Sequence, residues 1–209
     1  MKLSWKMIGA LCGILGPLLF VIITVVAMIV RPVPYIFWEN SFSSLGLMVT
    51  ETIPSMLNYY LFVAACTSAA VCTVPFWFAI RTLFTETSFV RITSWLGTIL
   101  GLIAVPCLSG LSIISGDFGT PHTLFTISFF LLISTAIVIY SAAIAVDNDY
   151  HWSYAIPGLI IGIICYAYAL GLFVPGLEFI GSAAVQKVAV YGLVIWSAFQ
   201  AIKLIQEFK

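Results

Sequence analysis

The sequence has very few charged side chains. Of its 209 residues, only 8% are Asp, Glu, Lys or Arg, whereas 62% are hydrophobic. A water-soluble domain carries about 25% charged residues, so this composition excludes one. Eight basic residues balance eight acidic residues, and the basic residues form no cluster. A nucleic-acid partner therefore has no electrostatic basis.

The apolar residues gather in six long runs. The first five contain no charged residue, and the sixth contains only Lys203, near its end. Each run has about the 17–25 residues that a helix needs to cross about 30 Å of hydrocarbon. The sequence predicts an all-α integral membrane bundle in a single membrane domain, 1–209. The expected transmembrane helices are 7–30, 59–80, 93–114, 123–146, 154–174 and 188–205.

The positive charges predict the orientation of these spans. Only Arg31 and Lys187 fall on the side opposite the termini. The terminal side carries Lys2, Lys6, Arg81, Arg91, Lys203 and Lys209. By the positive-inside rule, we expect a multi-pass protein of the plasma membrane with both termini cytoplasmic. Trp77 falls near the inner boundary of the second span, so we expect its ring to lie at the headgroup level.

The outer segment 31–58 is too long for a simple connection. It mixes aromatic rings with small polar groups, as an element lying in the plane of the interface does. We expect it to pack over the bundle. Two interpretations remain open: a lid that covers a ligand, or a plain interfacial cap.

The cysteines show no pattern of metal or redox chemistry, and the glycines indicate close helix packing. The five cysteines all lie within apolar runs, and no pair has a CxxC spacing. We therefore expect packing residues, with no metal site and no cofactor. Glycines recur at one-turn spacing, which lets helices approach closely or contact other membrane proteins. They are Gly9, Gly13, Gly16, Gly97, Gly101, Gly158 and Gly162.

The polar residues gather at the outer ends of the spans. The middle of the spans has no ionisable group, which argues against the proton relays of pumps and transporters. From the outer set we predict an outward-facing polar pocket. Its expected ligand-binding residues are Asn40, Ser43, Asn58, Asp117 and His122.

The sharpest local pattern leads into the fourth span. Thr120 can cap this helix and Pro121 suits its first position, which puts His122 in the first turn. If the protein catalyses a reaction, His122 would be the acid or base, Asp117 its orienting partner and Ser43 an oxygen donor or nucleophile. No Gly-x-Ser-x-Gly elbow supports a hydrolase. The alternative is that both residues are solvated around an ordinary helix start, so enzymatic activity stays open.

Three motifs, in order along the chain, carry a resemblance. They are Asn40-Ser-Phe-Ser-Ser-Leu-Gly46, Asn58, and Gly116-Asp-Phe with Pro121-His122. The chain resembles the domain-of-unknown-function 998 family of six-span membrane proteins, whose layout is similar to that of the DRAM proteins. Members often have an acidic residue where this chain has Ser44, and an acidic-basic pair where it has Gln186-Lys187. The resemblance implies a six-span fold and an outward polar cluster, but no activity.

These observations favour a binding role. An apolar space between helices with a few polar groups at its mouth suits an amphiphile. The leading hypothesis is a pocket for a lipid or a lipid-linked small molecule, with membrane lipids as partners. The alternative is a non-enzymatic accessory or scaffold subunit, held in a larger membrane complex through its glycine-rich helix faces. A transporter is the weaker alternative.

Overall fold

The computed structural model describes residues 4–147 and 150–208. All six long helices are long and apolar enough to cross a membrane. This confirms the prediction of an all-α bundle of six helices. The helices are α1 (Trp5–Val30), α2 (Met56–Arg81), α3 (Ser88–Ile113), α4 (Thr120–Val146), α5 (Ala155–Gly171) and α6 (Ala183–Glu207).

Several helices extend beyond the apolar runs. α3 begins at Ser88 because the Thr87 hydroxyl accepts a hydrogen bond from a backbone N–H of the first turn. Ser182 caps α6 in the same way. Hydroxyl caps of this kind let a helix start among polar residues that hydropathy leaves outside a span. α4 is capped by Gly119, at a φ of 61°, and not by Thr120, which is its first residue. A positive φ of this size favours glycine.

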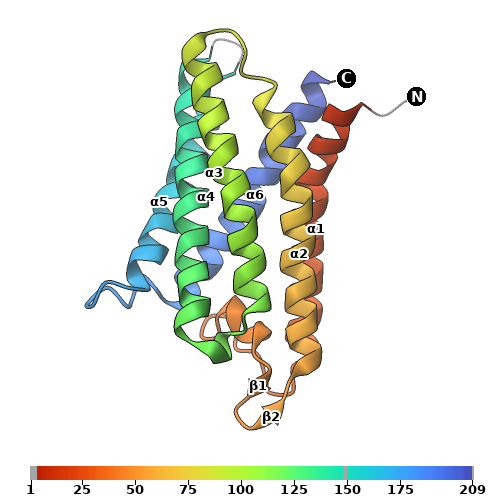
Figure 1. The fold of residues 1–209 in the computed structure, drawn as a ribbon, viewed down its shortest axis with the longest axis vertical. Helices are drawn as coiled ribbons and strands as arrows, with labels where there is room; N and C mark the ends of the chain where they lie inside the picture. The colour runs from red at the N-terminus through yellow and green to blue at the C-terminus, as the bar shows by residue number, and fades with distance from the viewer. Residues whose placement is uncertain (1–3, 148–149, 209) are drawn as a thin grey trace.

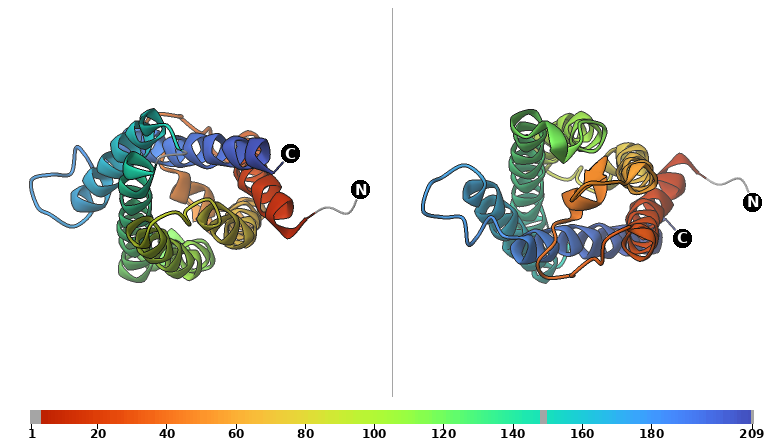
Figure 2. Two further views of the ribbon diagram at one scale, coloured as in Figure 1. Left: turned by 90° about the horizontal axis from the view of Figure 1, so that it is seen from above. Right: turned by 90° about the horizontal axis from the view of Figure 1, so that it is seen from below.

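The helices form a ring in which each packs against its neighbours in chain order, and α6 closes the ring against α1 (Figures 1 and 2). The start of α1 and the end of α6 lie at one end of the bundle, which we call the terminal end. The opposite end carries segment 31–55, and we call it the lid end. Sequence neighbours are therefore spatial neighbours, as short connections require.

Segment 31–55, the lid, folds across its end of the ring. It contains the 3₁₀ helix η1 (Phe42–Gly46) and a small antiparallel pair, β1 (Val49–Thr50) and β2 (Ile53–Pro54). Seen along the bundle, η1 lies in the middle of the ring (Figure 2). Phe42 and Leu45 are buried there. The expectation that this segment packs over the bundle is confirmed.

The predicted glycines lie where helices meet. A Cβ on Gly9 would come within 2.5 Å of the carbonyl oxygen of Pro75, and one on Gly16 within 2.6 Å of Cβ of Cys72. Glycine thus lets α1 lie directly against α2. The scaffold alternative would therefore need a surface other than these glycines, which contact helices of their own chain.

Trp77 corrects one expectation. Its side chain is only 1% exposed, and its ring lies 5.8 Å from that of Trp196 and 5.4 Å from that of Tyr140. The prediction of a ring at the headgroup level was wrong, because this face of α2 points into the ring of helices. Buried aromatic residues of this size dominate the packing of a core.

Candidate functional site: the lid and the cavity beneath it

Asn58 lies in the first turn of α2 and completes the end of α1. Its buried Nδ2 donates a hydrogen bond of 2.5 Å to the carbonyl oxygen of Ala27. Ala27 is in the last turn of α1, whose carbonyls have no partner within their own helix. Asn58 therefore supplies a donor that α1 lacks.

His122 does the same for α3. Its Nδ1 lies 2.7 Å from the carbonyl oxygen of Ile114, the residue that caps α3. A carbonyl oxygen only accepts, so Nδ1 carries a proton and donates to it. Tyr59 adds a second donor, because its hydroxyl bonds the carbonyl of Ile113 at 2.9 Å. The starts of α2 and α4 thus supply donors to carbonyls at the ends of α1 and α3.

Asp117 attaches the lid to the bundle. It lies in the short 3₁₀ helix η2 (Gly116–Phe118). Its Oδ2 accepts a hydrogen bond of 2.7 Å from the backbone N–H of Met48 in the lid, and one of 2.6 Å from the hydroxyl of Ser115. Ser115 Oγ also lies 2.8 Å from the carbonyl oxygen of Gly46, at the end of η1. The carboxylate and this serine together hold the lid from the α3–α4 side.

Asn40 accepts hydrogen bonds from several residues of the lid. Its Oδ1 accepts hydrogen bonds from the backbone N–H of Ile36, at 2.7 Å, and from the guanidinium of Arg31, at 3.3 Å. Its backbone carbonyl accepts from the hydroxyl of Tyr35, at 2.8 Å, and from the ammonium of Lys187. Burial raises the pKa of Tyr35, so this hydroxyl keeps its proton at neutral pH and remains a donor.

The five predicted ligand-binding residues all lie at the lid end, but most of their bonds are internal. Ser43 pairs with the hydroxyl of Ser41 at 2.8 Å. In the part of the chain that the structure describes, no hydrogen bond joins Ser43, Asp117 and His122 to one another. The imidazole nitrogen that an orienting aspartate would bond is held by a backbone carbonyl instead. In residues 4–147 and 150–208, no group of three or more His, Cys, Asp or Glu side chains is placed to hold a metal ion.

Gln186 is a site residue that the sequence analysis did not select. It is 4% exposed and joins the lid to two helices. Its Oε1 accepts a hydrogen bond of 2.7 Å from the backbone N–H of Phe42, and its Nε2 donates one of 2.8 Å to the hydroxyl of Tyr168 on α5. A glutamine at the start of an apolar run is a visible signal, but its partner 144 residues away is not.

Lys187 is fully buried, with 0% of its surface exposed. Its ammonium donates to the Asn40 carbonyl and lies 5.1–5.4 Å from the ring centres of Tyr35, Phe37 and Phe42. A cation this close to an aromatic face is attracted by it, and more strongly away from water. Lys187 therefore holds three aromatic residues of the lid over the bundle.

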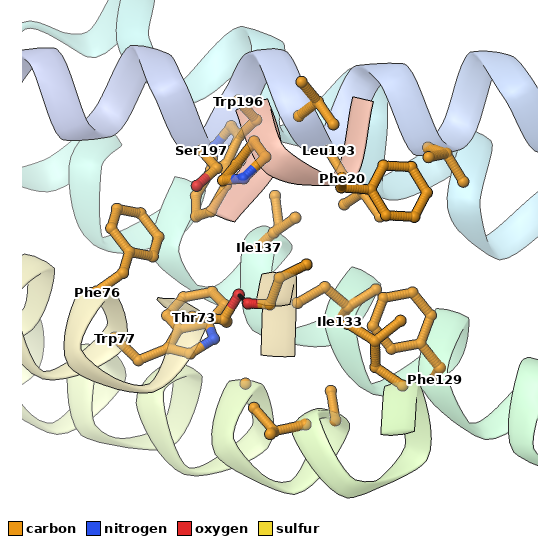
Figure 3. A pocket seen from close by; sticks show the side chains of 18 residues that line it. Phe20, Thr73, Phe76, Trp77, Phe129, Ile133, Ile137, Leu193, Trp196 and Ser197 are labelled. Carbon is orange, nitrogen blue, oxygen red and sulfur yellow. Dashed lines mark hydrogen bonds between the residues drawn. The ribbon is translucent and has the colours of Figure 1, made fainter. Parts of the chain in front are cut away.

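Beneath the lid lies a cavity of about 130 Å³ in the middle of the ring (Figure 3). Phe76, Trp77 and Trp196 lie at one end of it, and Phe20 and Phe129 at the other. Between these bulky groups the wall is made by small or aliphatic residues. They include Ala69, Gly101, Ala104, Val105, Leu108, Ile133 and Ile137. None of the described residues that line the cavity carries a charge.

One aromatic contact connects the lid to this cavity. Phe42 of η1 packs edge-on against Phe20 of α1, with 5.6 Å between ring centres. Phe42 also packs against Tyr191 of α6 at 5.6 Å. Since Phe20 lines the cavity, the buried face of the lid is in contact with the cavity wall.

The comparisons with known proteins give no relative. No protein-family model, curated protein or solved structure matches the chain. The case for a function therefore comes from the geometry of the lid and the cavity.

Proposed function

We propose that this multi-pass membrane protein binds an amphiphile, a lipid or a lipid-linked small molecule, with its apolar part in the central cavity. The observation that carries the proposal is the uncharged cavity of about 130 Å³, whose wall residue Phe20 packs against Phe42 of the lid. Such a void forfeits packing contacts, so an apolar occupant would restore them. An apolar protein cavity of about 150 Å³ stays dry and binds benzene. The space suits a short part of a chain or a single ring.

The polar part of the amphiphile would lie at the lid end. Asp117 is exposed there, and Asn40 and Ser43 are half-buried, so all three can reach a headgroup. His122 is 8% exposed, and Nε2 would be the ring atom that reaches a headgroup because Nδ1 bonds the Ile114 carbonyl. Asn58 is buried as a helix cap and would support the site indirectly. The hydrogen bonds of Asp117 and Ser115 to the lid would open when a ligand enters.

The lid end would face outward at the plasma membrane. Of the described basic residues, Lys6, Arg81, Arg91 and Lys203 belong to the terminal end, whereas Arg31 and Lys187 belong to the lid end. Lys2 and Lys209, which also entered the topology prediction, lie outside the described residues. Positive residues favour the cytoplasmic side. A Thr52→Cys label in the exposed β1–β2 turn should react with an impermeant maleimide on intact cells, and labelling only after lysis would contradict this topology.

The binding proposal is tested by filling the cavity. Ala104 lines it and is 0% exposed, so Ala104→Leu puts three more carbons into the space. Ala64 is exposed on α2, and Ala64→Leu is the matched control. Native mass spectrometry of protein extracted in mild detergent should find a bound amphiphile on the wild type and on Ala64→Leu, and a loss of about tenfold or more on Ala104→Leu.

Two results would overturn the proposal. One is the same bound lipid at the same occupancy on all three proteins, which would place it on the outer surface. The other is a stoichiometric protein partner with no amphiphile on the wild type, which would favour an accessory subunit. Thermal unfolding of Ala104→Leu at or above the wild-type temperature would show that the variant is folded.

A further inference from the structure

A second hollow lies on the outer surface of the bundle between α5 and α6, and we call it the α5–α6 groove. It has a volume of about 370 Å³. Its wall is made by Ile161 and Ile164 of α5, by Lys187, Val188, Tyr191, Gly192 and Ile195 of α6, and by Trp38 of the lid. None of these residues lines the central cavity. The groove is therefore a separate site from the one proposed above.

The groove begins at the lid end and runs along α6 into the apolar layer. Lys187 lies near the start of α6, and the first part of the lid, which carries Trp38, passes α6 outside the ring (Figure 2). Ile195 lies a little over two turns further along α6, about 12 Å deeper. Val188 and Ile195 are 49% and 65% exposed. A bound chain would therefore have its polar end level with the lid and its hydrocarbon beside α6.

The lid end of this groove is positively charged. The ammonium of Lys187 and the guanidinium of Arg31 lie 5.4 Å and 5.6 Å from the centre of the Tyr35 ring. Neither forms an ion pair with a carboxylate in the part of the chain that the structure describes. Glu39, the one acidic residue of segment 31–40, is exposed. Two cations thus stand against one carboxylate, which favours an anion beside them.

Lys187 would act on an anion at short range and not by contact. None of its surface is open to water, and a charge removed from water is unfavourable unless it is compensated. One carbonyl and three aromatic faces compensate it in part. Charges attract each other more strongly near a protein than in bulk water. An anion at the mouth of the groove would therefore stabilise this ammonium.

Two other side chains of the groove can donate to a headgroup. Trp38 is 62% exposed, and Tyr191 is half-buried. Neither the indole N–H of Trp38 nor the hydroxyl of Tyr191 has a hydrogen-bond partner within residues 4–147 and 150–208. Tryptophan and tyrosine also prefer the headgroup level of a membrane.

We propose that the α5–α6 groove binds a glycerophospholipid of net negative charge from the leaflet at the lid end. Its phosphate lies near Trp38 and Lys187, and one acyl chain lies along Val188, Gly192 and Ile195. The positive charge at the mouth selects the anionic headgroup, and the apolar wall holds the chain. This site goes beyond the proposed function, because it uses no residue of the central cavity wall.

The test uses two lipids with the same chains and different net charges. The full chain is placed in nanodiscs of equal dioleoylphosphatidylglycerol and dioleoylphosphatidylcholine, and native mass spectrometry identifies the lipid that stays bound. The wild type should retain phosphatidylglycerol about fivefold more often, the effect of one basic residue on an anionic lipid. Lys187→Met should lose this preference, and Lys187→Arg should keep it. Arg91→Gln, at an exposed position of the terminal end, should leave it unchanged.

A second variant tests the groove without touching the contacts of Lys187 with the lid. Ile195→Trp puts a larger side chain into the groove and should lower the occupancy of the bound phosphatidylglycerol about fivefold or more. Ile202 is 48% exposed on the same helix and does not line the groove. Ile202→Trp is therefore the matched control and should keep the lipid.

Three results would overturn this inference: equal retention of the two lipids by the wild type, an equal loss of preference for Arg91→Gln and Lys187→Met, or full occupancy on Ile195→Trp. The cavity variant Ala104→Leu should keep the lipid of the groove, because Ala104 lines only the central cavity. Failure of this inference and failure of the proposed function are therefore seen in different variants.

Discussion

The interior at the lid end and the interior around the cavity differ in their polar groups. At the lid end, Asn58, Gln186 and Ser115 have hydrogen-bond partners at 2.5–2.8 Å. Around the cavity, the described wall residues carry no charge, and a space of about 130 Å³ is left between them. Fully satisfied polar groups stabilise one arrangement, whereas an unfilled apolar space forfeits packing contacts. This difference supports the proposal that the lid is a closed cover over a cavity that binds an apolar group.

The strongest test of the lid as a closed cover removes Gln186. Gln186→Leu leaves the backbone N–H of Phe42 and the hydroxyl of Tyr168 buried without their partner. Each such loss is worth about 1–3 kcal/mol, so we expect unfolding to become easier by about 2–4 kcal/mol, measured by thermal or denaturant unfolding in detergent. Gln206→Leu, at an exposed position on the same helix, should change stability by less than about 0.5 kcal/mol. Equal effects of the two variants would show that the lid contact contributes nothing.

The next test acts on the cavity wall. A Cβ on Gly101 would lie 2.3 Å from the indole ring of Trp77, so Gly101→Ala must displace this ring. We expect a loss of about 1–3 kcal/mol, as for overpacked cores, together with a change in tryptophan fluorescence. The nearest atom to a Cβ on Gly192 would be in the side chain of Ile161, at 3.1 Å, so Gly192→Ala is the milder control. An unchanged spectrum for Gly101→Ala would contradict the placement of Trp77 against α3.

The contact of exposed Asp117 with the lid should contribute less to stability than the buried contact of Gln186. Asp117→Ala removes the acceptor for Met48 N–H and for the Ser115 hydroxyl, but Asp117 is open to water. Each net hydrogen bond contributes about 0.5–1.5 kcal/mol, and we expect a total loss of about 1–2 kcal/mol. Protease cleavage within the lid should accelerate as well. Glu39→Ala, at another exposed position of the lid, should leave both unfolding and cleavage as they are.

The smallest effect should come from Glu178, in the turn before α6. The backbone N–H of Gly176 bonds its carboxylate at 3.0 Å and lowers the pKa of Glu178. Because the folded pKa is lower than the unfolded one, this contribution is present at neutral pH and is lost as the pH falls below about 4.3. The side chain is fully exposed, so the unfolding temperature of Glu178→Gln should match the wild type at pH 7. A clear loss for Glu178→Gln at pH 7 would show that this turn contributes to the lid.

Hydropathy predicted the six helices because the apolar runs are long and the bilayer thickness sets their length. It placed helix ends less well where Thr87 and Ser182 start helices among polar residues. The sequence also placed Asn58, Asp117 and His122 at one end of the bundle. It could not show that Asn58 and His122 cap preceding helices, because a hydrogen bond to a backbone carbonyl leaves no pattern in the sequence.

The sequence could not predict the cavity. Its wall combines small residues such as Ala69 and Ala104 with the rings of Trp77 and Trp196, from different helices. A void depends on how these side chains fit together and not on the apolar pattern of any one helix. Trp77 was expected at the membrane surface for this reason, and only the ring arrangement shows that it faces inward.

One measurement tests the central claim most directly: a crystal structure of the full chain grown from a lipidic mesophase. We predict continuous density in the space between Phe20 and Trp77, too long for water. A space that is collapsed, or that holds separate water molecules only, would contradict it.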